Sequence, residues 1–175
     1  MTRRAVLLTA LRRAGAVLKR RFGKVSYKQK RRADLLTIAD LESQQTILDT
    51  ILRAFPDDGT TNYAHGYPAA CVSIGVLRNG QALLAGVYDP FRDELFLARK
   101  GGGATLNGKK LRISKTDKLA NSLLITGFAY DRAERANFYL ARFKAFLIRC
   151  HDIRRSGSAA LDMAWVAAGR ADGFW

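Results

Sequence analysis

Cysteine and long apolar segments are both scarce in this sequence. Its two cysteines, Cys71 and Cys150, match no metal-ligand spacing and are too few for a disulfide scaffold, so we expect a reducing, cytoplasmic setting. No run is long and apolar enough to span a membrane, and we therefore expect no membrane partner. Internal repeats and linkers are absent too. With 175 residues, 48% of them hydrophobic, the chain can build one sizeable core, which predicts a single compact domain.

Acidic residues are missing from the start of the chain, between Met1 and Ala33. Over the whole sequence 30 Lys+Arg stand against 15 Asp+Glu, which gives a net charge of +15. A field of this sign attracts polyanions such as RNA or an anionic membrane. We prefer a solvated helix face, because apolar residues at helical spacing predict an amphipathic helix: Leu7, Leu11, Ala14, Leu18 and Phe22. A targeting peptide fits less well, since no processing site follows.

The middle of the chain predicts one helix followed by antiparallel strands. Apolar residues recur at helical spacing over residues 41–55, and Pro56 ends that helix. Asn79-Gly80 and Asn107-Gly108 each supply the positive φ of a tight hairpin turn. The glycines at 101–103 could be mistaken for a phosphate loop, but no helix follows them, so we expect a bulge.

The last third of the chain predicts strands alternating with helices. Residues 121–128 are typical of a strand, residues 133–148 of a helix with one apolar side, and residues 152–175 of a strand followed by a helix. Ser158, at the start of that last helix, is either a plain N-cap or part of an anion-binding turn. The order of the elements argues for an α+β fold, a mainly antiparallel sheet flanked by helices, rather than a doubly wound parallel sheet.

The candidate site is the cluster Asp58-Gly59-Thr60-Thr61. The Asp58 carboxylate could bind a hard cation such as Mg²⁺, Gly59 would let backbone N–H groups approach phosphate oxygens, and a threonine could orient a water. One carboxylate alone would hold magnesium poorly. The partners of this cluster therefore have to come from elsewhere in the chain.

Stretches along most of the chain follow one another in a distinctive order: "DLLTIAD" (34–40), "DGTTNYAHGYP" (58–68), "VSIGV" (72–76), "VYDPFRDELFLARKGGGATLNGKKLRIS" (87–114), "TGFAYDR" (126–132) and "RRSGSAALDMAWVAAGRADGFW" (154–175). Together they resemble the inositol monophosphatase family of magnesium-dependent, lithium-sensitive phosphatases. The resemblance implies a layered α/β sandwich that hydrolyses a small phosphate monoester with Mg²⁺ ions and an activated water. It leaves the substrate open among inositol phosphate, a sugar phosphate, histidinol phosphate and a nucleotide bisphosphate.

The resemblance also assigns roles to particular residues. Asp58 matches a metal ligand, the second aspartate of the family motif D-P-x-D-G-T-T. Gly59 and Thr60 match positions whose backbone N–H groups hold the phosphate. The Thr60 hydroxyl and Asp40 match the catalytic groups beside the attacking water. The segment of Gly157, Ser158 and Ala159 matches part of the substrate pocket.

Departures from the family pattern are as informative as the matches. Between "FPDD" and "DGTTN" the family has a Gly-Glu-Glu loop and a buried strand, and both are missing here. Asp57 cannot replace the first motif aspartate, because it is adjacent to Asp58 rather than three residues before it. The family pattern also continues beyond Trp175 into further acidic residues. We therefore hypothesise an internal deletion together with a shortened C-terminus, which would impair or abolish hydrolysis.

These departures set the remaining expectations. We expect a single incomplete domain over residues 1–175, with an N-terminal portion to about residue 130 and the start of a second subdomain over 131–175. A missing strand would expose sheet edges, so the chain could form a homodimer. The alternatives to a phosphatase are a catalytically inactive basic protein that binds RNA or an acidic partner, and a non-functional remnant. Nucleic acid is the less favoured partner, because no aromatic-rich RNA motif is present.

Overall fold

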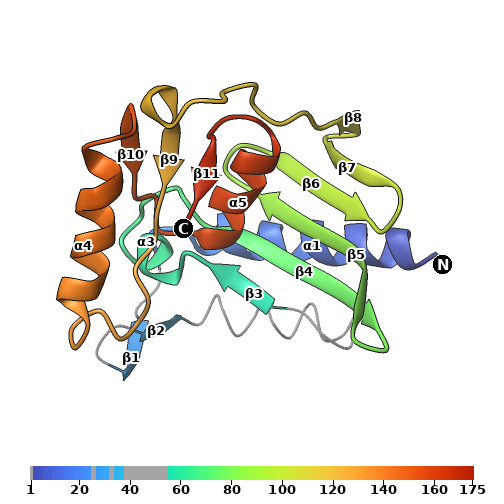
Figure 1. The fold of residues 1–175 in the computed structure, drawn as a ribbon. Helices are drawn as coiled ribbons and strands as arrows, with labels where there is room; N and C mark the ends of the chain where they lie inside the picture. Colours follow the sequence, from blue (N-terminus) through green and yellow to red (C-terminus); the bar gives the residue numbers. More distant parts are fainter. Residues whose placement is uncertain (1, 25–26, 32–33, 38–54) are drawn as a thin grey trace.

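A six-stranded antiparallel sheet is the centre of the fold. The computed structural model describes residues 2–24, 27–31, 34–37 and 55–175, and for 27–31, 34–37 and 55–58 it describes the backbone only. The strands of this sheet lie in chain order: β3 (Phe55–Asp58), β4 (Cys71–Arg78), β5 (Gln81–Asp89), β6 (Glu94–Arg99), β7 (Gly103–Leu106) and β8 (Lys109–Lys110). Helix α1 (Arg3–Arg21) covers one face and helix α5 (Ala159–Ala167) the other (Figure 1). The predicted layered α+β fold is confirmed.

Helix α1 is the amphipathic helix that the sequence predicts. The Thr2 hydroxyl caps it by accepting a hydrogen bond from the backbone N–H of Ala5 at 3.3 Å. Cations occupy its last turn, where they complement the helix dipole. Its predicted apolar positions are buried, apart from Phe22, which follows the helix and is partly buried against the same core. Glycine at position 86 lets α1 lie close to the sheet, because a Cβ there would be 2.5 Å from Leu11 Cδ1.

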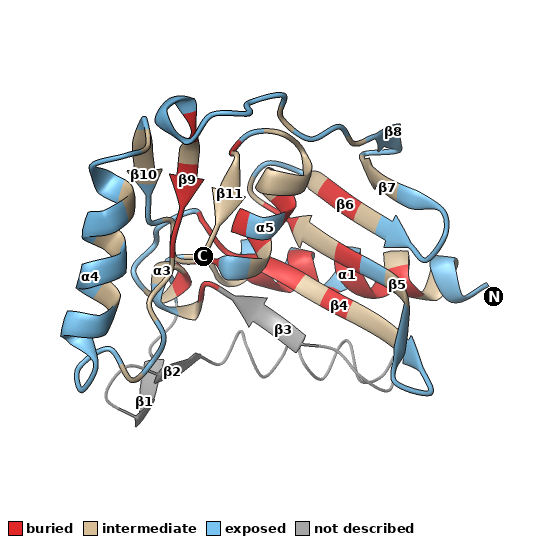
Figure 2. Cartoon of the chain, in the orientation of Figure 1, coloured by how far each residue is buried: buried red, intermediate tan, exposed pale blue. Residues whose placement is uncertain are grey.

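Each face of the sheet carries its own hydrophobic core. Under α1 the core joins apolar residues of the helix to Val72, Ile74 and Leu95 of the strands. On the opposite face Cys71 and Phe96 pack against Leu161 and Ala164 of α5. Figure 2 shows buried residues along α1 and β4 and on the inner side of α5, and a separate buried group along β9 (Leu123–Ile125). The two cores therefore fix the positions of both helices relative to β4. This strand is the next one along the chain after the candidate cluster Asp58-Gly59-Thr60-Thr61.

The two predicted hairpins are present. Asn79 and Gly80 connect β4 to β5 with φ of 50° and 74°, and Asn107 and Gly108 connect β7 to β8 with φ of 47° and 83°. Two successive positive φ angles are the geometry of a type I′ turn. The predicted bulge at residues 101–103 is wrong. Lys100, Gly101 and Gly102 form the turn between β6 and β7, and Gly103 begins β7, so the two strands keep a continuous register. Positive φ at Gly101 and Gly103 lets the chain close this short loop.

The start of β3 corrects a second expectation. The sequence predicts a helix that ends at Pro56 and no strand before Gly59. Instead, Phe55–Asp58 is a strand antiparallel to β4, with Phe55 opposite Ser73 and Asp58 opposite Cys71. Proline is tolerated there because β3 is the edge strand, and an edge position does not require every N–H to bond within the sheet. The rest of the helix predicted at 41–55, with Asp40 before it, lies outside the described residues.

A smaller parallel sheet forms the second layer of strands. Its order is β10 (Asp152–Arg154), β9 (Leu123–Ile125) and β11 (Gly173–Phe174), and α4 (Ala136–Leu147) lies beside it (Figure 1). The predicted apolar side of α4 is half-buried: the rings of Tyr139 and Phe143 lie 5.9 Å and 6.3 Å from that of Phe128. The remaining described elements are β1 (Tyr27–Arg31), β2 (Asp34–Thr37), α3 (Thr60–Ala64) and η1 (Leu119–Asn121). Of the helices described, none is both long and apolar enough to cross a membrane.

Candidate functional site

The turn at Gly59 requires glycine for two independent reasons. Gly59 precedes α3 with φ of 97°, a conformation that side chains strongly disfavour. A Cβ at this position would also lie 2.6 Å from the carbonyl oxygen of Ala69 and 3.1 Å from Ala70 Cα. The chain therefore turns sharply between β3 and α3 while pressed against the segment that leads into β4. Thr60 follows as the first residue of α3 and is half-buried.

The start of α5 forms the facing part of the site. Gly157 has φ of 93°, and Ser158 is the N-cap with an extended backbone. The Ser158 side chain makes no capping hydrogen bond, and its Oγ lies 3.6 Å from Cys71 Sγ on β4. Ser158 is thus at the predicted N-cap position, but its fully buried hydroxyl points toward the sheet instead of the helix backbone.

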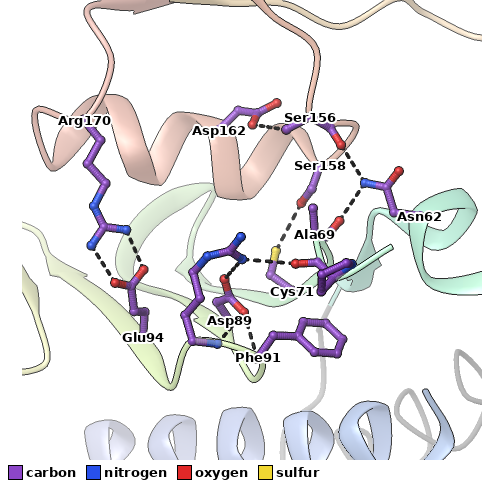
Figure 3. Close-up of polar contacts among 12 residues, drawn as sticks. Asn62, Ala69, Cys71, Asp89, Phe91, Glu94, Ser156, Ser158, Asp162 and Arg170 are labelled. Carbon is purple, nitrogen blue, oxygen red and sulfur yellow. Dashed lines mark hydrogen bonds and ion pairs between the residues drawn. The ribbon is translucent and has the colours of Figure 1, made fainter. Parts of the chain in front are cut away.

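Asn62 joins these two turns. Its Nδ2 donates to the Ala69 carbonyl and to the Ser156 carbonyl, both at 2.7 Å, and Figure 3 shows the side chain between them. A Cβ at Gly157 would lie 2.9 Å from the Asn62 amide, so glycine is needed for this approach as well. Both N–H groups of one amide are thus used to hold two loops that are distant in sequence at a fixed separation.

A buried carboxylate supports the α5 side of the site. Asp162 is 1% exposed and accepts a hydrogen bond from the Ser156 hydroxyl, while its own N–H donates to the Ser158 carbonyl at 2.9 Å. The loop before α5 is therefore fixed to the first turn of the helix. Sequence reasoning missed both Asn62 and Asp162. The available signals were an amide directly after "DGTT" and an acid in the first turn of a helix, and both are common without a special role.

Asp89, the last residue of β5, holds the turn between β5 and β6. The carboxylate is fully buried and accepts from the N–H groups of Phe91 and Arg92 at 2.9 Å and 3.2 Å. The Arg92 guanidinium also donates to Asp89 at 2.8 Å and to the Pro68 carbonyl at 3.1 Å. This network fixes the β5–β6 turn to the loop that precedes β4.

The predicted site residues fall into two groups. Gly59 and Thr60 lie at one turn, Gly157–Ala159 lie at the other, and Asn62 connects the two. Asp58 ends β3, where only its backbone is described, and Asp40 lies outside the described residues. Within the part of the chain that the structure describes, no three His, Cys, Asp or Glu side chains gather as a metal ion would require. The carboxylates on which a magnesium site would depend, those of Asp58 and Asp40, are not among the side chains that the structure describes.

Comparison with known proteins gives concordant results. The model of the inositol monophosphatase family matches residues 56–175. The Nus factor SuhB of Xylella fastidiosa is 38% identical over 97% of this chain and 71% of its own length. The inositol-1-monophosphatase of Synechocystis is 41% identical over 93% of this chain and 66% of its own. The crystal structure of the extragenic suppressor protein suhB of Bartonella henselae superposes with a TM-score of 0.92, with 32% identity over 98% of this chain and 76% of that one.

The chain is shorter than its relatives, spanning 66–76% of the lengths of these three proteins. Part of the shortfall lies inside the matched region. The aligned stretch with the Xylella protein is 196 residues long, yet 97% of 175 residues is about 170, so the relative has roughly 26 residues there that this chain lacks. An internal deletion of the kind that the sequence predicts is consistent with this difference.

Proposed function

This chain belongs to the inositol monophosphatase family, and from that premise we propose that it binds a small phosphate monoester where the Gly59 turn meets the start of α5. The observation that carries the proposal is the pair of hydrogen bonds from Asn62 to the Ala69 and Ser156 carbonyls. They hold the two turns together although 94 residues separate Asn62 from Ser156.

Backbone groups, rather than charged side chains, would recognise the phosphate in this proposal. A glycine turn with positive φ exposes consecutive N–H groups, which bind anions well, and we assign Gly59 and Thr60 to this role. The amino-terminal end of α5 adds the positive end of a helix dipole, and we assign Gly157, Ser158 and Ala159 to the substrate pocket there. The rest of the substrate stays open among the phosphate esters that the sequence allows.

We further propose that hydrolysis is impaired in this chain. Magnesium, when bound, polarises the ester and activates a water, and it needs several oxygen ligands. Asp58 remains the proposed ligand, with Thr60 and Asp40 beside the water. The family motif D-P-x-D has another carboxylate three residues before Asp58, and this chain has Phe55 there. An apolar ring cannot coordinate Mg²⁺, and one carboxylate fewer also lowers the negative charge that holds the ion.

The test separates binding from hydrolysis. Calorimetric titration with inositol monophosphate should give saturable binding, and inositol without the phosphate should give none. Asn62→Ala should weaken the binding about tenfold, because the two turns lose their common tether. Asn137→Ala on the exposed surface of α4 is the matched control and should leave the affinity unchanged. Equal affinity for Asn62→Ala and the native chain would overturn the proposed binding site.

Hydrolysis of inositol monophosphate should be followed in parallel, with and without Mg²⁺. We expect no more than a small fraction of the turnover of a full-length relative such as the Synechocystis enzyme. Substantial Mg²⁺-dependent turnover that Asp58→Asn removes would contradict the proposed impairment while leaving the binding site in place.

A second candidate function, binding of RNA or another polyanion, is favoured by one observation. Helix α1 has no acidic residue in its first turn, and its exposed surface carries cations along its length: Arg3, Arg4, Arg12, Arg13, Lys19 and Arg20. Relatives of this chain bear the names inositol-1-monophosphatase and Nus factor, so membership of the family does not by itself select one function.

Three expectations from the sequence are kept as proposals. We propose a cytoplasmic location, a division near residue 130 between two subdomains, and a homodimer. The homodimer is supported by apolar side chains on the outer surface around α4, where Leu140 is 56% and Ile148 67% exposed.

A further inference from the structure

A cavity of about 330 Å³ lies between the first turns of α1 and the sheet, on the face opposite α5. Its floor is apolar and includes Leu7 of α1, Leu84 of β5 and Leu97 of β6. Arg4 and Arg99 line it as well. The volume is within the range of pockets that hold small ligands. Because α5 and the Gly59 turn lie elsewhere, the cavity is separate from the phosphate site proposed above (Figure 1).

The register of the sheet explains why the hollow forms there. Leu84 is opposite Arg99, and Leu97 is opposite Thr105, so side chains from three strands point to the same face. Leu11, one turn after Leu7, packs directly onto Gly86. The helix is thus set close to the sheet at that point, and its first turns leave the face over β5, β6 and β7 incompletely filled.

The glycines at 101–103, two in the turn between β6 and β7 and one at the start of β7, keep the cavity open. Gly102 and Gly103 line it and have no side chains that could fill it. Gly102 also makes room for Arg99, because a Cβ there would lie 2.7 Å from the Arg99 Nε. The Arg99 guanidinium therefore packs across the turn at the border of the cavity. The glycine run at 101–103 has no part in the proposed phosphate site. Its structural effect is to leave space for the cavity and for the Arg99 side chain.

The charged side chains that line the cavity are both positive. Arg4 and Arg99 are both exposed, and no acidic residue of the described part of the chain lines the cavity with them. Among the residues that the structure describes, neither guanidinium makes an ion pair or a hydrogen bond. An apolar floor with two uncompensated cations selects for a ligand with an apolar body and an anionic head group.

We propose that this cavity binds an amphiphilic monoanion with a short apolar body, of which a medium-chain carboxylate is the simplest example. The apolar chain lies on Leu7, Leu84 and Leu97, and the carboxylate accepts hydrogen bonds from Arg4 and Arg99. Arginine suits this role because its planar guanidinium can bind both carboxylate oxygens.

Three probes with the same eight-carbon chain test the proposal: octanoate, octanol and octylamine. Each is titrated into the isotopically labelled chain while amide chemical shifts are followed by NMR. Octanoate should bind saturably and shift the amides of Gly102, Gly103 and Thr105. Octylamine should bind at least about tenfold more weakly, since its charge is repelled by the two arginines. Equal binding of all three probes, or octanoate shifts confined to other regions, would refute the proposed head-group recognition.

Two kinds of variant test separately the contribution of the arginine charges to octanoate binding and the contribution of the cavity's shape. Arg4→Gln and Arg99→Gln should each raise the octanoate Kd about three- to fivefold, as expected for one exposed charge contact. Arg112→Gln removes a charge from another exposed position and should leave the Kd unchanged. Leu84→Phe should fill the floor and abolish binding although both arginines remain. Unchanged octanoate binding in Leu84→Phe would place the ligand outside this cavity and overturn the proposal.

Discussion

At the scale of single residues, Gly59 controls how closely the candidate site can be assembled. Its neighbour Gly66 provides a matched comparison, because Gly66 also has positive φ (68°) but would meet no atom within 4 Å if it carried a Cβ. The two glycines therefore differ in steric surroundings and not in the sign of φ. Comparing them separates the cost of the backbone conformation from the cost of the close contact.

Gly66→Ala should lower the free energy of unfolding by about 1 kcal/mol, the usual cost of a left-handed conformation for a side chain. Gly59→Ala should lower it by about 2–4 kcal/mol, because its Cβ would also meet the Ala69 carbonyl at 2.6 Å and neither backbone segment can move freely. Urea unfolding of both variants measures the difference. Equal losses in the two variants would mean that the packing at Gly59 relaxes easily.

The sequence predicted some of these residues and could not predict others. Gly59 and Gly157 were predicted as site residues because they stand in stretches that match the family pattern. Asn62 could not be recognised, because its two acceptors are backbone carbonyls 7 and 94 residues away. Every residue has a backbone carbonyl, so no pattern of side-chain types in the sequence predicts such a contact.

At the scale of elements, an ion pair connects the end of α5 to the sheet. Arg170, which follows α5, donates to both carboxylate oxygens of Glu94 on β6 at 2.5 Å and 2.6 Å. These hydrogen bonds from Arg170 hold the pKa of Glu94 below its ordinary value, against an opposing contribution from burial. Since α5 begins at the candidate site, this pair helps to fix the helix that carries Gly157–Ala159.

Glu94→Gln should lower the free energy of unfolding at pH 7 by about 0.5–1 kcal/mol, a modest value because Arg170 is 40% exposed. A carboxylate with a lowered folded-state pKa stabilises the fold above the unfolded-state pKa of about 4.3, and this contribution disappears as pH falls through the folded-state pKa. The difference between the native chain and the variant should therefore shrink below about pH 4.

Urea unfolding at a series of pH values measures this effect. Glu134→Gln is the control, because Glu134 is exposed and has no side-chain partner within the described residues, and it should change the stability little at any pH. A Glu94→Gln difference that stays constant from pH 7 to pH 3 would show that hydrogen bonding without charge accounts for the effect.

Elements with strong local signals were predicted well, and those set by their neighbours were not. Helix α1 has its own periodicity, and Asn-Gly pairs determine the two hairpins by their backbone preference. Strand β3 was missed because its four residues carry a proline and two acids, which locally disfavour a strand. What selects it is the edge of β4, whose backbone groups need partners, and that requirement becomes visible only in the assembled sheet.

At the scale of the whole molecule, the fold of a longer protein is retained in a chain that lacks part of it. The Bartonella structure matches over 98% of this chain with a TM-score of 0.92, although the match covers 76% of that protein. Strand β3 maintains the sheet at the point where the sequence departs from the family pattern. Layered packing around two separate cores allows this, because each helix is stabilised by its own face of the sheet.

The net charge of +15 is a property of the whole chain, and it leads to a last prediction about RNA. Single-stranded RNA should bind with an affinity that falls steeply as salt rises, because cations on α1 displace counterions from phosphates. Reversing Arg13 and Arg20 together to glutamate should weaken the binding and lower the salt slope by roughly 1–2, about 0.7 for each lost phosphate contact. Filter binding over a range of NaCl concentrations measures both quantities.

The control for this prediction reverses the same charge on another surface. Lys109 and Lys110 of β8 are also exposed, so changing both to glutamate produces an identical net charge at a position remote in sequence from α1. If α1 is the binding surface, the α1 variant loses affinity and the β8 variant keeps most of it. Equal losses in both variants would mean that only the net charge attracts RNA, and a salt-independent affinity would remove the electrostatic explanation altogether. Either result would leave phosphate-ester binding as the better supported function of this basic chain.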